Sequence, residues 1–250
     1  MKHQPWVVKF GGSLLSDGKA RAGFLREAAA LSRRRPLVLV HGGGPEINAA
    51  LEKMGVKPKF VQGRRVTDDA AMAVVEGVLS GQVNKALTGE LNSFGVKAVG
   101  LSGRDGGLLR ARPVPKLGRV GAPAQARPDV LLVLMRAGFL PVVSSVASDA
   151  RHRAMNVNAD EAASALAVAL KAERLVFLTD VAGVLDARKK TIPLVRCREI
   201  EKLIKDGVIT GGMIPKVRSC RRAIEKGVQE IDIIDGRSGL RRMKGTRLLP

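Results

Sequence analysis

Two glycine clusters follow short apolar segments, at positions where a backbone could bind phosphate. The first is Gly11-Gly12-Ser13, after residues 6–10, and the second is His41-Gly42-Gly43-Gly44, after residues 37–40. In an open α/β sheet, ligands bind at the carboxyl ends of strands, and glycines there let backbone N–H groups approach an oxyanion at a helix N-terminus. One glycine pair could equally form a tight turn. Two clusters at the same sheet position favour phosphate binding.

Two lysines occupy positions where a cation needs an anionic partner. Lys9 lies inside an apolar segment directly before the first glycine cluster, and a buried or half-buried lysine requires a partner. Lys216 follows a third glycine cluster, at 211–212, and lies near the start of a predicted helix, where the macrodipole disfavours a cation. An anion opposite Lys216 is one explanation, and a solvated lysine is the other. Neither a Walker A sequence nor a G-x-G-x-x-G fingerprint occurs, so a nucleotide would be held in another way.

A third candidate lies at residues 156–161, which open a helix with an apolar face. Asn158 is a good N-cap and Asp160 suits the first helical turn, so helix capping accounts for both. Capping does not require Asn156, which is therefore a candidate for binding.

Short β-branched segments alternate with longer helical stretches, which predicts an α/β fold with a mainly parallel sheet covered by helices. Strands are expected at 6–10, 37–40, 98–101, 140–143, 175–178 and 230–234. Helices are expected at 23–32, 45–54, 68–94, 130–137, 159–170 and 212–226. Residues 108–128 are rich in Pro, Gly and Arg, and we expect a hairpin or irregular excursion there, outside the core.

The composition indicates a globular protein, since 45% of its 250 residues are hydrophobic. No apolar run approaches the length of a membrane span and the start lacks a signal-peptide pattern, so we expect a cytoplasmic protein without membrane contact. In that reducing compartment Cys197 and Cys220 should stay free and serve in packing.

The net charge of +20 predicts attraction to anions, which include nucleotides, acidic substrates, acidic proteins and nucleic acids. Nucleic acid is disfavoured, because aromatic residues make up only 3% of the chain and the basic residues are dispersed.

Seven motifs, in their order and spacing, resemble those of acetylglutamate kinases in the amino-acid kinase family. They are Lys9-Phe10-Gly11-Gly12-Ser13, residues 41–48, Arg65-Val66-Thr67-Asp68, residues 100–106, residues 156–160, residues 178–184 and residues 211–217. The resemblance implies one amino-acid kinase domain over 1–250, an open αβα sandwich. Its N-lobe, 1–172, would bind the acyl amino acid, and its C-lobe, 173–250, would bind ATP.

The same resemblance implies the reaction and the residues that perform it. ATP would phosphorylate the side-chain carboxylate of N-acetyl-L-glutamate in arginine biosynthesis, with Mg²⁺ held mainly by the ATP phosphates and not by protein ligands. Lys9 and Lys216 would stabilise the transferring phosphoryl group, and Asp160 would orient both. The acyl amino acid would be bound by Gly43, Gly44, Arg65 and Asn156. ATP would be bound by Gly11, Gly12, Asp180, Val181, Ala182, Gly183, Val184, Leu185, Val208, Ile209 and Thr210, with Gly44 as a further phosphate donor.

The chemistry of phosphoryl transfer agrees with these residues. It requires positioning and electrostatic stabilisation more than covalent catalysis. A carboxylate acceptor is already ionised at neutral pH, so no general base is needed. We therefore expect His152 on the surface and His41 as a hydrogen-bonding support of the glycine loop. Two adjacent lysines should hold the pKa of Asp160 low.

Arg65 has two interpretations, a solvated turn or bidentate capture of the α-carboxylate of the substrate. We favour capture, because the guanidinium geometry matches a carboxylate.

Arginine-inhibited relatives carry an extra N-terminal helix and a longer segment after the Asp-Gly-Arg motif. Here only residues 238–244 separate Asp235-Gly236-Arg237 from Gly245-Thr246. We therefore expect a short, arginine-insensitive enzyme that resembles the homodimeric members.

Alternatives from the same superfamily fit less well. A kinase for aminoadipate or glutamate on an acidic carrier protein agrees with the charge, but residues 44–48 and 63–67 look more like the free-substrate family. Carbamate and uridylate kinases match poorly at 156–160 and at Arg65. A non-catalytic anion-binding protein would not need Lys9, Asp160 and Lys216 together.

Overall fold

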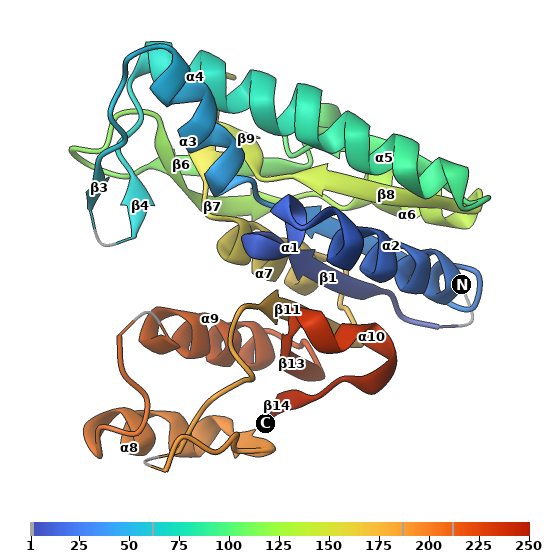
Figure 1. The fold of residues 1–250 in the computed structure, drawn as a ribbon, viewed down its shortest axis with the longest axis vertical. Helices are drawn as coiled ribbons and strands as arrows, with labels where there is room; N and C mark the ends of the chain where they lie inside the picture. The colour runs from blue at the N-terminus through green and yellow to red at the C-terminus, as the bar shows by residue number, and fades with distance from the viewer. Residues whose placement is uncertain (1–2, 62, 187, 212) are drawn as a thin grey trace.

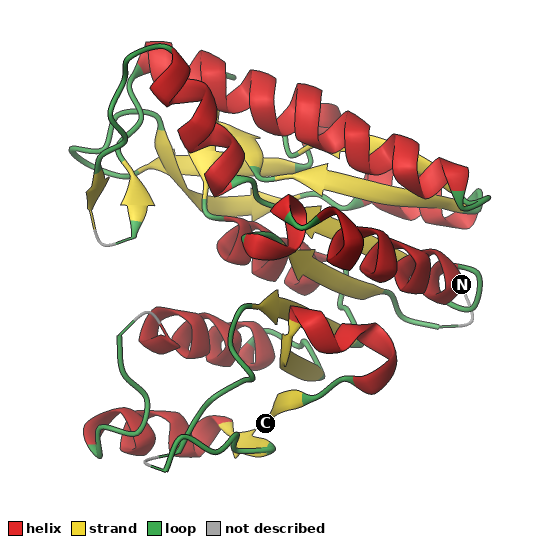
Figure 2. Cartoon of the chain, viewed as in Figure 1, coloured by secondary structure: helices red, strands yellow, loops and turns green. Residues whose placement is uncertain are grey.

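The computed structural model describes residues 3–61, 63–186, 188–211 and 213–250, and its centre is an eight-stranded sheet (Figures 1 and 2). The strand order is β12-β14-β13-β11-β1-β2-β8-β5, and only the β13–β14 pair is antiparallel within this described sheet. The strands are β1 Trp6–Phe10, β2 Leu37–His41, β5 Lys97–Ser102, β8 Phe139–Ser144, β11 Arg174–Thr179, β12 Leu194–Arg196, β13 Glu230–Asp235 and β14 Gly245–Leu249. All six predicted strands belong to it.

Both faces of the sheet are buried, because successive residues of a strand point to opposite sides. Val7 of β1 packs into a cluster with α6 (Asp129–Arg136), α7 (Ala159–Ala169) and α9 (Met213–Glu225). Val8 packs into another cluster with α2 (Gly18–Ser32) and α5 (Asn84–Ser93). The predicted open αβα sandwich with a mainly parallel sheet is therefore confirmed.

The predicted helix at 68–94 is continuous but irregular in its middle. It consists of α4 (Asp69–Glu76), a π-helical segment η1 (Gly77–Val83) and α5, which follow one another above the sheet in Figure 1. Single π-helical turns occur frequently at functional sites. The remaining α-helices of the described chain are α1 Ser13–Ser16, α3 Gly44–Lys53, α8 Ile200–Lys205 and α10 Gly239–Arg242.

The segment 108–128 forms the expected hairpin, from β6 (Leu109–Pro113) and β7 (Val120–Ala126). Together with β9 (Val146–Ser148) and β10 (Ala154–Val157) it makes a closed four-stranded unit. Our prediction that this segment lies outside the core is wrong. Leu109 and Ala111 are buried in the cluster of α6 and α7, because they alternate along β6 with outward-facing arginines.

A small two-stranded element, β3 (Phe60–Val61) with β4 (Arg64–Arg65), projects beside the four-stranded unit in Figure 1. Among the described residues, none of the helices combines the length and the hydropathy of a membrane span. Cys197 and Cys220 are free, as predicted.

Close packing of α5 on β5 depends on Gly100. A Cβ at Gly100 would lie 2.7 Å from Thr88 Oγ1 and closer still to Asn84 Oδ1. Asn84 is buried and donates to Val142 O at 2.9 Å, so its side chain cannot move away from the added methyl group without breaking this hydrogen bond. We expect Gly100→Ala to lower the free energy of unfolding by about 1–3 kcal/mol, measured by urea titration.

The matched control is Gly23→Ala in α2, where an added Cβ meets no atom within 4 Å. It should leave stability unchanged or raise it by about 0.4–1 kcal/mol. Equal losses in both variants would contradict the packing argument.

Candidate active site

One aspartate joins two lysines from opposite ends of the chain. Asp160 lies in the first turn of α7, Lys9 near the end of β1, and Lys216 in the first turn of α9. Lys9 Nζ is 2.9 Å from Asp160 Oδ1, and Lys216 Nζ donates a hydrogen bond to Asp160 Oδ2. The three side chains are between 14% and 20% exposed, so the pairs are shielded from bulk water but reachable.

The charge state of Asp160 follows from this position. Burial raises the pKa of Asp160, but the charges of Lys9 and Lys216 and their hydrogen bonds lower it further, to about 2. Asp160 is thus a carboxylate at neutral pH. Asn158 Oδ1 accepts from the backbone N–H of Asp160 at 2.9 Å, which confirms the predicted N-cap and fixes the first turn of α7.

Both glycine loops face one cavity of about 260 Å³ beside Lys9. Its lining includes every glycine, arginine and asparagine predicted from the sequence to contact phosphate or acyl substrate. These are Gly11, Gly12, Gly43, Gly44, Arg65 and Asn156. A second space of about 790 Å³ adjoins Asp160 and Lys216 and is also lined by Gly63 and Arg64.

Arg65 is a buried cation without a carboxylate partner in the described chain. Its side chain stacks on Phe60, with Cζ 4.8 Å from the ring centroid, and Nη2 donates to Gly44 O at 3.2 Å. Nη1 is buried and has no hydrogen-bond partner among the described residues. Burial lowers the pKa of Arg65. A buried guanidinium with an unused donor is suited to an anion that enters the cavity.

Residues predicted to bind the nucleotide fall into two groups. Asp180 is exposed beside the first glycine loop, where it accepts from Ser13 Oγ at 2.6 Å. Val181, Ala182 and Thr210 are also exposed, whereas Leu185 and Val208 are half-buried.

The second group is buried. Val184 and Ile209 are each 1% exposed and share a hydrophobic cluster, so only their backbone could face a ligand. Gly183, at φ 131°, packs against Thr246, whose Oγ1 would lie 2.6 Å from an added Cβ. These buried residues anchor the two loops, 180–185 and 208–210, to the rest of the fold by packing.

His41 supports the second glycine loop, as predicted. Asn84 Nδ2 donates to His41 Nε2 at 3.0 Å, and since that nitrogen accepts, Nδ1–H donates to Gly42 O at 2.8 Å. Burial, assisted by the charge of Lys85, lowers the pKa of His41 to about 4. His41 is therefore neutral at physiological pH, and His152 is exposed, as expected.

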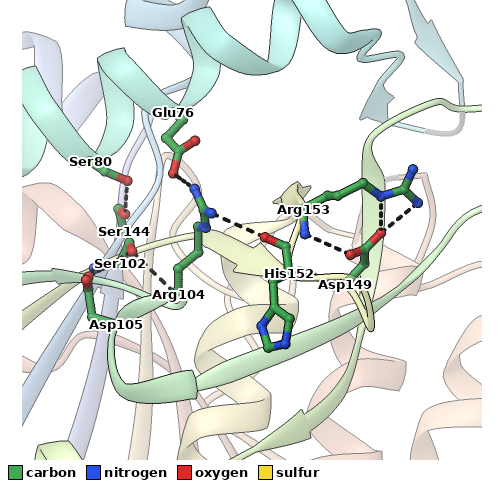
Figure 3. Close-up of polar contacts among 9 residues, drawn as sticks. All are labelled: Glu76, Ser80, Ser102, Arg104, Asp105, Ser144, Asp149, His152 and Arg153. Atoms are coloured by element: carbon green, nitrogen blue, oxygen red, sulfur yellow. Dashed lines mark hydrogen bonds and ion pairs between the residues drawn. The ribbon is translucent and has the colours of Figure 1, made fainter.

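The motif at 100–106 lies outside the cavity lining and has a supporting position (Figure 3). Ser102 N and Oγ both donate to Asp105 Oδ2, at 2.6 and 2.8 Å. Arg104 forms an ion pair with Glu76 of α4 and donates to His152 O at 3.3 Å. These contacts fasten the end of β5 to α4 and to the β9–β10 turn.

A further contact in Figure 3 lies next to residues that line the cavity. The hydroxyl groups of Ser80, in η1, and Ser144, at the end of β8, lie 2.8 Å apart. The neighbours of both, Leu79 and Ser145, line the 260 Å³ cavity. The π-helical segment is thus held against the strand end beside the cavity.

Sequence reasoning missed several lining residues. They are Pro45, Ile47, Phe60, Leu79, Val120, Val157 and Ser145. All but Ser145 are apolar, and apolar residues at helical or strand spacing carry the same signal whether they fill the core or line a cavity.

The chain is similar to known proteins over nearly its whole length. The family described as "Amino acid kinase family" matches residues 4–235. The acetylglutamate kinase of Endomicrobium trichonymphae is 48% identical over 240 residues, which cover 96% of each chain.

Solved structures share the fold. The crystal structure of smu.665 from Streptococcus mutans UA159 has a TM-score of 0.86 at 29% identity and covers 100% of this chain and 99% of its own. A carbamate kinase from Giardia lamblia bound to AMP-PNP has a TM-score of 0.72 at 18% identity, covering 99% of this chain and 98% of its own.

Because His41 is buried and neutral, we expect the free energy of unfolding to depend on pH. Unfolding exposes an imidazole with an ordinary pKa of 6.5, whereas the folded pKa is about 4. Between these values the unfolded state binds the extra proton, so this contribution is complete above pH 6.5 and is lost as the pH falls toward 4. The loss should reach about 3 kcal/mol in the free energy of unfolding, measured by urea titration across this range.

In His41→Gln this component of the pH slope should disappear. The exposed His152→Gln variant is the control and should keep the slope. The reverse pattern would contradict the assignment to His41.

Proposed function

The chain belongs to the amino acid kinase family and, within it, to the acetylglutamate kinases, and on this premise we propose that it transfers the γ-phosphoryl group of ATP to the side-chain carboxylate of N-acetyl-L-glutamate. This reaction is a step of arginine biosynthesis. The observation that carries the proposal is the Lys9–Asp160–Lys216 array beside a glycine-lined cavity.

In the proposed reaction, a carboxylate oxygen of the substrate bonds to the γ-phosphorus while the bond from that phosphorus to the bridging oxygen of ATP breaks. ADP leaves, and no proton has to be removed because the acceptor is ionised. Charge develops on the phosphoryl oxygens, where the ammonium groups of Lys9 and Lys216 would stabilise it. Asp160 would keep both ammonium groups in place. Backbone N–H groups of Gly11, Gly12 and Gly44 would bind phosphate oxygens.

Arg65 would pair with the α-carboxylate of the substrate. Its buried, unpartnered Nη1 supports this assignment, because an ion pair in a shielded cavity satisfies a donor that the described chain leaves free. Gly43, Gly44 and Asn156 line the same cavity and would contact the acyl group and the backbone of the substrate. Free N-acetyl-L-glutamate is the proposed substrate, in agreement with the name of the relative at 48% identity.

We assign the acyl amino acid to residues 1–172 and ATP to residues 173–250. Asp180–Leu185 and Val208–Thr210 would bind the nucleotide, with the buried Val184 and Ile209 contributing backbone only. The described residues contain no group of three or more His, Cys, Asp or Glu side chains suited to hold a metal. Mg²⁺ commonly binds through substrate phosphates and water, so ATP would bring it and it would offset phosphate charge. A cytoplasmic homodimer is the proposed working state.

Removal of Lys216 tests the reaction directly. The wild-type protein is given ATP, Mg²⁺ and one member of a panel of small carboxylates at a time. Trapping with hydroxylamine should detect an acyl phosphate when that carboxylate is N-acetyl-L-glutamate. Lys216→Ala should lower turnover by about 10²–10³-fold, because one preorganised cation is lost from the transition state.

The control is Arg221→Ala on the same helix, which breaks only surface ion pairs with Glu201 and Glu225. It should keep wild-type turnover. Undiminished acyl phosphate formation by Lys216→Ala would contradict the mechanism.

Arginine sensitivity gives a separate prediction. Between the Asp-Gly-Arg motif and β14 the chain has only residues 238–244, and α10 occupies Gly239–Arg242 within them. The resemblance associates arginine inhibition with a longer segment there. We expect millimolar arginine to leave the initial rate unchanged, and strong inhibition in the same assay would contradict this.

A further inference from the structure

Thr67 joins two residues that line the cavity from different parts of the fold, Arg65 of β4 through its backbone carbonyl and Asn156 of β10 through its side-chain amide. We infer that the Thr67 hydroxyl is a positioning group that sets the placement of Arg65 relative to Asn156 and thereby the affinity for the acyl amino acid. This inference rests on the proposed function. Thr67 is 0% exposed and is not among the residues that line the cavity, so it acts through its neighbours.

The hydroxyl uses both of its hydrogen-bonding capacities. Thr67 Oγ1 donates to the carbonyl oxygen of Arg65 at 2.8 Å and accepts from Asn156 Nδ2 at 3.1 Å. A hydroxyl has a single proton, so the donor and acceptor roles are assigned without ambiguity. One atom therefore links the backbone of the carboxylate-binding residue to the amide of the opposite wall.

The same link orients Asn156. Because its Nδ2 is directed at Thr67, its Oδ1 is the atom left for other partners, and no described residue donates to it. An N-acylated amino acid carries an amide N–H, which can donate a hydrogen bond to the Oδ1 carbonyl oxygen. The orientation set by Thr67 thus leaves an acceptor for the N–H of the proposed substrate.

The backbone of Thr67 is anchored independently of its hydroxyl. Thr67 N donates to Leu117 O at 3.1 Å, and Arg119 N donates to Thr67 O at 2.6 Å. Gly118, at φ 69°, lies against this bridge, and any Cβ there would collide with Thr67 O. Arg119 O also accepts from Asn156 N at 2.8 Å. The β6–β7 turn therefore holds both backbones.

Removal of the hydroxyl should consequently disturb side-chain placement more than the fold. Thr67→Val keeps the shape but leaves the Arg65 carbonyl and the Asn156 amide without this partner. Neither Lys9, Asp160 nor Lys216 contacts Thr67 by a hydrogen bond or ion pair in the described structure, so phosphoryl transfer itself should be affected less than substrate binding.

Steady-state kinetics with each substrate varied in turn, and calorimetric binding of N-acetyl-L-glutamate, test the inference. Thr67→Val should raise the KM and the Kd for N-acetyl-L-glutamate by about tenfold, as expected for two lost hydrogen bonds. The KM for ATP should stay within about twofold, a change below the effect of one hydrogen bond. Thr67→Ser retains the hydroxyl and should restore the KM for N-acetyl-L-glutamate to within about threefold of wild type.

Three results would overturn the inference. They are an unchanged KM for N-acetyl-L-glutamate in Thr67→Val, an equal rise in both KM values, and failure of Thr67→Ser to restore affinity. Urea titration of both variants monitors folding, and Thr67→Ala takes the place of Thr67→Val under the same criteria if the latter does not fold. A wild type that binds N-acetyl-L-glutamate without forming acyl phosphate would refute the proposed reaction alone, since the Kd comparison still decides on Thr67.

Discussion

The architecture of the site depends on one electrostatic constraint: two ammonium groups can share a shielded space only if an anion lies between them. Asp160 supplies that anion, with Lys9 on one oxygen and Lys216 on the other. The two lysines lower the pKa of Asp160 despite burial, and the start of α7 adds a favourable dipole. The two cations proposed to bind phosphate are thus preorganised by a group of the chain and need not be ordered by a ligand.

Sheet topology explains why residues so distant in sequence meet. β1 lies between β2 and β11, and the chain proceeds from β1 to β2 on one side, whereas β11 and β13 occupy the other. Ligands of open α/β sheets bind outside the carboxyl ends of strands at such a switch point. Lys9 is near the carboxyl end of β1, and α7 packs across this strand, which brings Asp160 to the same edge.

Much of this could be predicted from sequence because it depends on local patterns. Alternating apolar segments predicted the strands, paired glycines predicted the loops around one cavity, and the apolar setting of Lys9 predicted an anionic partner. The burial of β6, the π-helical segment and the hydrogen bonds of Thr67 were not predictable, since each depends on contacts between segments far apart in the chain. Val184 and Ile209 illustrate the same limit: their motifs indicated a loop near the nucleotide, but only packing shows that the side chains face inward.

The lysines and Arg65 have different charge partners in the described structure, and this difference suits the tasks that we propose for them. The lysines are paired with Asp160 within the protein, whereas Arg65 is buried with one guanidinium nitrogen unpartnered in the described structure. An unpaired buried cation is costly, so a ligand that brings a carboxylate to Arg65 removes a penalty that a neutral ligand leaves in place. The cavity is therefore suited to an anionic ligand, while the +20 net charge accelerates the approach of anions without choosing among them.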